Sequence, residues 1–174
     1  MSTQTDTLSR RRRAEPVSEF GPATGPFPCQ PGETFGFRLW QIVHAWQRRL
    51  EGALAPLDLT HLQFVTLATV GWLSSQGDTP TQSRIAGFAK LDPMMLSKIL
   101  RLLETKGYVV RRRHPKDRRA IRVELSPAGR AALEHAIPLA LAAQDAFFGR
   151  LGAAGAAELS AQLDRLMALE SSGA

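Results

Sequence analysis

Residues 91–129 read LDPMMLSKILRLLETKGYVVRRRHPKDRRAIRVELSPAG. In the first half, apolar residues recur at helical spacing between Pro93 and Lys106. Asp92 is the expected N-cap, and Pro93 has the backbone angle that suits a first helical position. Gly107 supplies the left-handed residue that commonly follows a helix. The stretch therefore begins with a short helix that has defined ends.

A β-hairpin is predicted directly after this helix. Residues 108–110 enter a first strand, and apolar residues alternate with polar ones from Ile121 to Leu125. The turn between the strands holds residues 114–118. Ser126 then caps a further helix, in which Pro127 takes the first position.

The helix after Ser126 is expected to run to about residue 148. Four more helices complete the expected secondary structure, and they span residues 34–55, about 60–73, about 82–89 and about 154–170. Thr60 and Gln63 have the spacing of a capping box. Either Thr79 or Thr81 caps the short helix over 82–89, and Pro138 is expected to kink the helix that contains it. Because the helices over 82–89 and 93–106 are joined by so few residues, they form a helix-turn-helix candidate.

Charge is unevenly distributed along the chain. The 174 residues carry a net charge of +6, and 44% of them are hydrophobic, which is enough for one compact domain with a core. Residues 84–130 hold 13 Lys and Arg against four Asp and Glu, an excess of +9, whereas the residues after 130 carry −3. This segregation predicts one basic face, which favours a phosphate backbone or an anionic membrane as partner.

Residues 1–33 are expected to form a flexible, basic and Pro-rich tail. The segment contains a run of four arginines and lacks the apolar core of a secretory signal. It also holds Cys29, the single cysteine, so the chain cannot form an internal disulfide. That cysteine usage suits a reducing cytoplasm, which is the location we expect. No uninterrupted apolar run approaches the ~20 residues of a membrane helix.

The outer face of the helix over 93–106 carries groups that suit the major groove of DNA. At about 100° per residue, one continuous arc faces the core and contains Met95, Leu96, Ile99, Leu100, Leu102 and Leu103. The remaining arc has a thioether, a hydroxyl and two cations, which can contact thymine methyls, base edges and phosphates. The residues of this helix that we expect to bind DNA are Pro93, Met94, Met95, Ser97, Lys98 and Arg101. An ordinary surface helix can show the same pattern.

The cations of the hairpin suit a second groove. In a winged helix the hairpin lies beside the major-groove helix, so its tip can reach an adjoining minor groove that attracts arginine. The hairpin residues expected to bind DNA are Arg111, Arg113, Lys116, Asp117, Arg118 and Arg119. At the start of the helix over 82–89, we expect Thr81, Gln82 and Ser83 to contact the DNA backbone. A solvated basic loop is the alternative interpretation of the charge run alone.

Residues 34–170 resemble the MarR family of bacterial transcription regulators. The most specific part is the wing pattern Asp-x-Arg-x5-Leu-Ser/Thr-x-x-Gly, which is met by Asp117, Arg119, Leu125, Ser126 and Gly129. The preceding LLETKGYVVRR matches the family's passage from recognition helix to wing. The resemblance implies a mainly α fold with a small β-hairpin (α+β). It also implies a winged helix-turn-helix over about 57–126 and dimerisation helices over about 34–55, 127–149 and 154–170.

The resemblance also implies roles for residues and a homodimer. Arg119 would enter the minor groove, and Asp117 would brace wing arginines through hydrogen-bonded ion pairs. The alternative is a tight turn in which Asp117 and Arg119 only pair with each other. Two-fold symmetry predicts a near-palindromic operator with half-sites ~34 Å apart. Independently, the last two helices carry more apolar side chains than a thin monomeric layer would bury, namely Ala140, Leu141, Phe147, Phe148, Leu163 and Leu166.

Relatives in this family often respond to small aromatic or anionic molecules, bound between the dimer helices and the winged domain. The resemblance makes Trp40, His44, Phe64 and Trp72 candidates to line such a pocket, although each also fits a core position of the first two helices. Arg38 or Arg48 could meet an acidic ligand. Cys29 makes a thiol-based redox sensor an alternative, but the only tyrosine is Tyr108, whereas redox-sensing relatives surround their thiolate with tyrosines.

Two other classes of function compete with a sequence-specific regulator. An enzyme is disfavoured because the four histidines lack metal-ligand spacing and the chain has no Gly-rich phosphate loop, nucleophile elbow or paired-carboxylate motif. We accordingly expect no cofactor and no metal. An architectural protein that coats DNA without reading its sequence is the second rival. The sequence favours a dimeric, ligand-responsive repressor that binds double-stranded DNA.

Overall fold

The computed structural model describes residues 32, 34–77 and 79–172. The expectations for the N-terminal tail, Cys29 included, lie outside the described residues. The chain divides into one unit that ends at Val43 and a second that begins at His44, and helix α1 (Phe35–Leu54) runs through both. In the first unit, Arg38 Nε donates a hydrogen bond to the Gly32 carbonyl (2.6 Å), and the rings of Phe37 and Trp40 stack at 5.6 Å.

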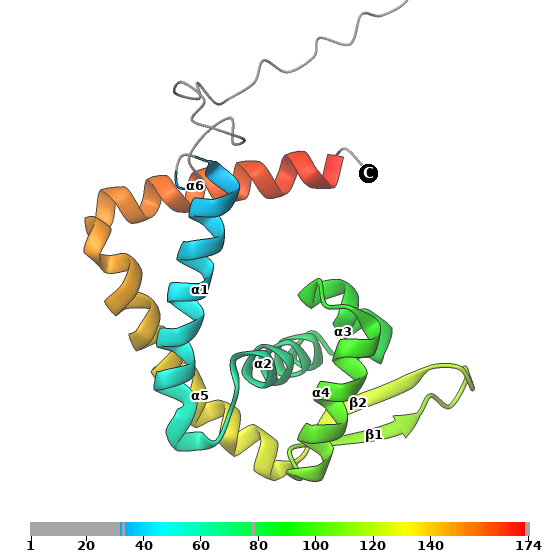
Figure 1. The fold of residues 1–174 in the computed structure, drawn as a ribbon. Helices are drawn as coiled ribbons and strands as arrows, with labels where there is room; N and C mark the ends of the chain where they lie inside the picture. Colours follow the sequence, from blue (N-terminus) through cyan, green and yellow to red (C-terminus); the bar gives the residue numbers. More distant parts are fainter. Residues whose placement is uncertain (1–31, 33, 78, 173–174) are drawn as a thin grey trace, which may run out of the picture. The chain divides into compact units, whose positions relative to one another are not determined.

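The second unit has the predicted order of elements (Figure 1), with one two-stranded antiparallel sheet among the described residues. After α1 come the short 3-10 helix η2 (Ala55–Leu57), α2 (His61–Ser75), α3 (Gln82–Ala89), α4 (Pro93–Thr105), β1 (Val109–Arg113), β2 (Ile121–Leu125), α5 (Pro127–Phe148), the 3-10 helix η3 (Gly149–Leu151) and α6 (Gly152–Ser172). The prediction of a mainly α fold with a small β-hairpin is confirmed.

Local capping chemistry sets the helix ends that the sequence indicated. At the start of α2, the Gln63 amide donates to Thr60 Oγ1 (3.3 Å), and the Thr60 amide donates to Gln63 Oε1 (3.2 Å), which forms the predicted capping box. Thr81, rather than Thr79, caps α3, because its Oγ1 accepts from the Arg84 amide at 3.3 Å. Helix α5 continues through Pro138.

We expect Thr60→Ala to lower the free energy of unfolding by about 1 kcal/mol, because it removes one half of the capping box and leaves a helix amide without its side-chain acceptor. Urea denaturation of the purified protein measures the change. Thr105→Ala is the matched control, since the exposed Thr105 hydroxyl only donates to the Arg101 carbonyl within α4. Equal stability of the Thr60 and Thr105 variants would contradict a stabilising role for the capping box.

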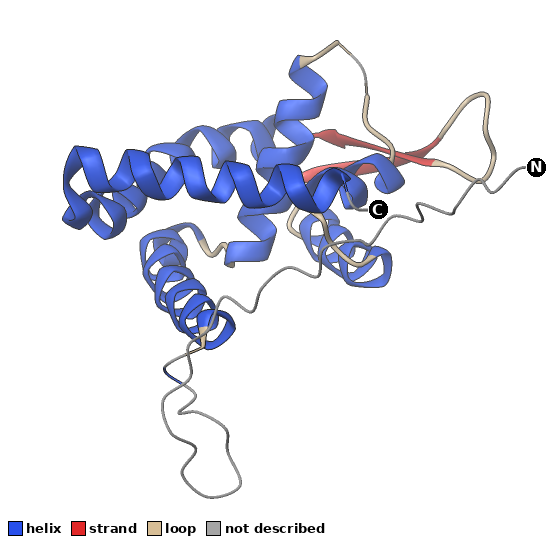
Figure 2. Ribbon diagram, turned by 90° about the horizontal axis from the view of Figure 1, so that it is seen from above, coloured by secondary structure: helices blue, strands red, loops and turns tan. Residues whose placement is uncertain are grey.

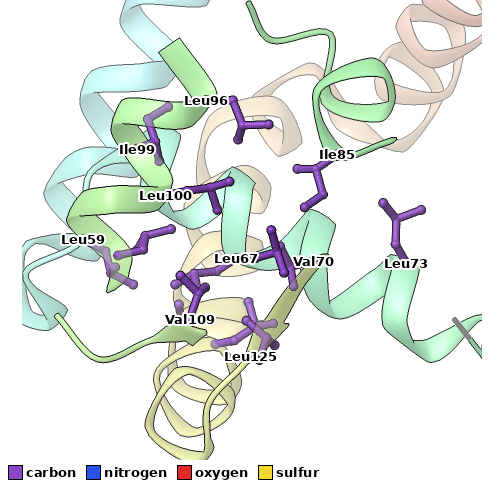
Figure 3. Close-up of a cluster of buried hydrophobic side chains, with 14 of the residues drawn as sticks. Leu59, Leu67, Val70, Leu73, Ile85, Leu96, Ile99, Leu100, Val109 and Leu125 are labelled. Atoms are coloured by element: carbon purple, nitrogen blue, oxygen red, sulfur yellow. The ribbon is translucent and has the colours of Figure 1, made fainter. Parts of the chain in front are cut away.

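The core forms around α2 (Figure 3). Leu67 and Val70 of this helix are fully buried, and they meet Ile85 of α3, Leu100 of α4 and Val109 of β1 in one cluster. Burial of side chains of this size contributes roughly 1.5–3 kcal/mol each. The central helix therefore joins α3, α4 and the hairpin in one core.

The hairpin has one face on this core. In its register Val109 pairs with Leu125 and Arg111 pairs with Val123, and these positions alternate with pairs on the other face, such as Arg112 and Arg122. The Val123 amide also donates to the Pro80 carbonyl at 2.9 Å. The hairpin is therefore held by α2 and by the segment that leads into α3.

The start of α5 is joined closely to the turn after α4. Ser126 Oγ donates to the Gly107 carbonyl (2.5 Å) and accepts from the Gly129 amide (2.9 Å), and the Ser126 amide donates to the Tyr108 carbonyl (3.0 Å). Gly129 is buried against the Tyr108 backbone. The Ser and Gly of the wing pattern thus form a backbone junction between α4, β1 and α5.

Candidate nucleic-acid interface

Helix α4 presents its polar arc to solvent. Asp92 Oδ1 accepts from the Met95 amide at 2.9 Å, and Pro93 begins the helix as predicted. The side chains that anchor α4 on the core are Leu96, Ile99, Leu100 and Leu103. On the opposite side Met94, Lys98 and Arg101 are exposed, and Ser97 is partly exposed. The groups that can contact base edges are therefore accessible along one face.

Two residues that we expected to face the core are exposed. Met95 is 45% exposed and Leu102 is 56% exposed, so the buried arc of α4 is narrower than the sequence predicted. Helical periodicity gives the direction of a side chain, but it does not show how far the neighbouring helices extend over it. The exposure of Met95 agrees with its place among the candidate DNA contacts, whereas Leu102 is an apolar surface residue that the helical wheel misplaced.

The hairpin turn is closed by its own hydrogen bonds, and it directs its cations outward. His114 Nδ1 accepts from the amides of Lys116 (3.2 Å) and Asp117 (3.1 Å), and Asp117 Oδ1 accepts from the Arg119 amide (2.9 Å). The side chains of Lys116, Arg118 and Arg119 are exposed. Figure 2 shows this turn projecting beyond the helices.

The resemblance suggested ion pairs between Asp117 and wing arginines. In the described part of the chain the Asp117 carboxylate instead binds the backbone amide of Arg119, as in the tight-turn alternative. An aspartate commonly accepts from an amide two residues later in this way. His114, which the sequence did not single out as a structural residue, provides the second side-chain acceptor of the turn.

A concave surface brings the hairpin, α3 and α4 together. A hollow of about 390 Å³ is lined by Gln82 and Ser83 of α3, by Pro93 at the start of α4 and by Arg119 of the turn. Leu91 and Ile121 also line it. Candidate residues from three separate parts of the sequence, two helix starts and the hairpin turn, thus lie around one hollow.

The remaining candidates of this interface differ in how available they are. Ser83 and Arg113 are exposed, whereas Thr81 uses its hydroxyl oxygen to cap α3. Arg111 forms an ion pair with Glu104 of α4 at 2.8 Å. The candidates are therefore not equivalent, and Arg111 is the one that is held by another protein side chain.

A second cavity contains two of the four candidate effector-binding residues. It has a volume of about 610 Å³ and lies between α2, α3, β2 and α5, with Phe64 and Trp72 in its wall. Trp40 and His44 are not part of that lining. The sequence did not identify its other members, which include Phe88, Leu133, Ile137 and, as charged groups, Arg130 and Glu134. These residues come together only through the packing of α3 and α5 against α2, which no local pattern shows.

Many apolar side chains of the expected dimerisation helices are exposed in the single chain. On α5 and α6 they include Leu139, Leu141, Leu163, Leu166, Met167 and Leu169. Of the residues named from the sequence, Leu141, Leu163 and Leu166 are exposed, whereas Ala140 is buried. Phe147 and Phe148 are half-buried in a cluster with Trp46 of α1, with ring centroids 5.9 and 5.4 Å from it. Large exposed apolar side chains in this number are typical of a surface that binds another protein.

No cluster of three or more potential metal ligands occurs within residues 34–77 and 79–172. No single helix in the described chain is both long and apolar enough to cross a membrane. His61 has a pKa lowered by burial, an effect that Glu51 opposes, but it lies at the start of α2 and does not line either cavity.

A tri-helical core with a tightly joined helix pair, followed by a β-hairpin that packs beside the second helix of that pair, defines a winged helix-turn-helix. The family model for the MarR family matches residues 59–121. The transcriptional regulator YdcH of Bacillus subtilis is 38% identical over 118 residues, which cover 68% of this chain and 80% of that protein. The chain belongs to the MarR family of transcriptional regulators.

Solved structures agree with this assignment. A cysteine-to-serine mutant of MarR from E. coli, in complex with operator DNA, is 26% identical with a TM-score of 0.69, and the match covers 75% of this chain and 91% of that one. The Mycobacterium tuberculosis repressor Rv2887 is 28% identical over 131 residues, or 75% of this chain and 91% of that protein. Its complex with DNA matches with a TM-score of 0.59.

Proposed function

We propose that this chain is a sequence-specific regulator of transcription that binds double-stranded DNA as a homodimer and acts as a repressor. The observation that carries the proposal is the single hollow around which Arg119, the start of α3 and the start of α4 lie. Such an arrangement lets one subunit contact a major groove, the adjoining minor groove and the phosphates between them. Two of the relatives described above are solved in complex with DNA.

Each element then has its own role at the operator. The exposed face of α4, with Met94, Met95, Ser97, Lys98 and Arg101, enters the major groove, where its groups can distinguish base pairs. Pro93 and the start of α3, residues 81–83, lie against the backbone, because helix N-termini favour phosphate. Arg119 enters the minor groove. Three of the other exposed cations of the hairpin, Arg113, Lys116 and Arg118, add salt-dependent affinity.

The dimer forms through α1, α5 and α6. The support for this is the exposed apolar surface of α5 and α6, which water disfavours and a second copy can cover. An interface of this kind is two-fold symmetric, so its recognition helices would address half-sites ~34 Å apart. The operator is then a near-palindrome.

The 610 Å³ cavity is the candidate site for an effector. Its wall is mostly apolar and aromatic, with Arg130 able to meet an anionic group, which suits a small aromatic acid. Since α3, β2 and α5 all contribute to the wall, a bound molecule can favour one arrangement of these elements and thereby change operator affinity. We further propose that the protein works in the bacterial cytoplasm and catalyses no reaction.

Selection of bound duplexes from a random pool tests the proposed function. A sequence-specific dimer enriches an inverted repeat, whereas an architectural protein yields no consensus and shows little preference over random competitor at the same salt concentration. Failure of the pool to converge would contradict the proposal and favour the architectural alternative.

Base preference should change when α4 is altered. We expect Arg101→Ala to cost about 1–3 kcal/mol on the selected duplex and to relax the preference at one position in each half-site. A second selection with the variant measures this change. Arg165→Ala removes the same charge from α6, outside the winged helix-turn-helix, and should leave the consensus as it is. An Arg101 variant that selects the parental consensus with undiminished affinity would exclude Arg101 from base recognition.

A further inference from the structure

An ion pair connects the two elements of the proposed DNA-binding surface directly. Arg111, the third residue of β1, donates from Nε to Glu104 Oε2 at 2.9 Å, and its Nη2 lies 2.8 Å from the same oxygen. Glu104 is the last but one residue of α4. The side chains are 21% and 39% exposed, so solvent screens this pair less than an ion pair that stands free on the surface. The pair thus lies where the end of α4 meets the hairpin.

The strand register explains why Arg111, among the cations of the hairpin, forms this pair. Arg111 lies opposite Val123, which is fully buried, and therefore on the face of the hairpin that packs on the core. Arg112, one residue further on, lies opposite Arg122 on the other face and is exposed. The apolar stem of Arg111 can cover core residues while its guanidinium reaches the end of α4. Arg111 therefore packs on the core with its stem and forms an ion pair with its guanidinium.

The location of Glu104 is unfavourable by other electrostatic criteria. A carboxylate in the last turn of a helix opposes the helix dipole. A carboxylate near a DNA-binding face also repels phosphate, within a segment that is otherwise strongly cationic. The contact with Arg111 compensates for both effects, which suggests that this contact is the function of the acid.

We propose that Glu104 and Arg111 act as positioning residues that fix the angle between the hairpin and α4, so that both can occupy adjacent grooves at once. Arg111 acts through Glu104 and not through contact with DNA. This inference rests on the proposed function, because the angle matters for binding only if both elements meet the same duplex. It assigns to Arg111 a role different from that of the exposed cations Arg113, Lys116, Arg118 and Arg119.

The direction in which Glu104→Gln changes the affinity for DNA distinguishes a phosphate contact of Arg111 from a positioning role. If Arg111 contacts phosphate, Glu104→Gln releases a cation and removes a negative charge, so affinity for DNA rises. If the pair positions the hairpin, the same substitution weakens binding although the protein becomes more positive. We expect a loss of about threefold to tenfold for Glu104→Gln, in keeping with the strength of partly buried charged hydrogen bonds, and a larger loss for Glu104→Ala, which also removes the acceptor.

The experiment measures fluorescence anisotropy of a labelled duplex, the one recovered by selection with the parent protein, over a series of salt concentrations. Glu124→Gln, on β2, is the matched control, because it removes one negative charge from the same hairpin and should bind at least as tightly as the parent. The Glu104→Gln and Arg111→Gln double variant keeps the net charge of the parent and should bind no more weakly than either single variant. Arg111→Gln should leave the slope of log affinity against log salt unchanged, since no phosphate contact is lost.

A second measurement does not need the operator. Hydrogen exchange of the peptide over residues 109–125 in the DNA-free protein should accelerate in Glu104→Ala and remain at the parental rate in Glu124→Gln. A pair with exchanged charges, Glu104→Arg with Arg111→Glu, should restore slow exchange and much of the affinity. Circular dichroism melts show that each variant is folded at the temperature of the assay.

The outcomes separate the two proposals. If the parent protein prefers no duplex over random competitor, the proposed function fails, and hydrogen exchange still decides whether the pair holds the hairpin. If the parent has an operator and Glu104→Gln binds it as tightly or more tightly, with unchanged exchange in Glu104→Ala, the positioning role is wrong and Arg111 returns to the set of direct DNA contacts.

Discussion

Replacing Arg119 by alanine is expected to weaken binding to the selected operator by about 5- to 150-fold at moderate salt. The side chain is exposed at the hollow that also includes the start of α3 and the start of α4. The turn itself should survive, because it is the backbone amide of Arg119 that binds Asp117 Oδ1, and this amide remains in the variant. The loss therefore reports a contact with DNA. Titration of a labelled duplex by fluorescence anisotropy measures it.

The salt dependence identifies the kind of contact. A cation that enters the minor groove displaces counterions condensed around the phosphates beside it, so Arg119→Ala should reduce the slope of log affinity against log salt by about one. Arg150→Ala removes a likewise exposed charge from η3, outside the winged domain, and is the matched control. If the Arg119 variant binds as tightly as the parent while the control behaves as expected, the wing does not contact the operator.

Replacing Gly129 by alanine is expected to destabilise the protein by about 3 kcal/mol or more. A Cβ at this position would collide with the carbonyl oxygen of Tyr108 and would come within 2.8 Å of the carbonyl carbon. Both belong to backbone that is fixed by the hydrogen bond from the Ser126 amide, so neither can move away easily. The variant must separate α5 from the turn after α4. Thermal and urea denaturation measure the effect.

Gly52→Ala provides the control for this substitution. Gly52 lies within α1, and a Cβ there would meet no atom within 4 Å, so alanine should stabilise the helix by up to about 1 kcal/mol. Replacement of glycine by alanine is therefore expected to lower the stability of the protein at position 129 and to raise it at position 52. A Gly129→Ala protein as stable as the parent would contradict the requirement for close contact between the start of α5 and the Tyr108 backbone.

The parts of the fold that the sequence predicted well are those decided by local chemistry. Thr60 with Gln63, Asp92 with Pro93, and Gly107 each act within one turn of the chain, and the structure confirms the helix ends that they indicate. Alternation from Ile121 to Leu125 likewise identified the second strand, and Val123 and Leu125 are buried as expected, whereas Ile121 at the end near the turn is 37% exposed. Such signals need no knowledge of what packs against the element.

The features that sequence reasoning missed depend on tertiary packing. The pairing of Arg111 with Glu104 follows from the strand register together with the position of α4, and a run of three arginines gives no sign that one differs from the others. The exposure of Leu102 depends on where neighbouring helices end. For the same reason Phe88 and Leu133, which are far apart in the sequence, could not be assigned to the cavity that they share with Phe64 and Trp72.

In the proposed complex, α4 and the hairpin turn of one subunit occupy adjacent grooves of the same operator. Methylation interference on the selected duplex tests it directly, because methyl groups on guanine N7 block the major groove and those on adenine N3 block the minor groove. We expect major-groove interference in each half-site, with minor-groove interference at its flank that disappears for Arg119→Ala. Interference confined to one groove, or minor-groove interference that persists in the Arg119 variant, would contradict the account.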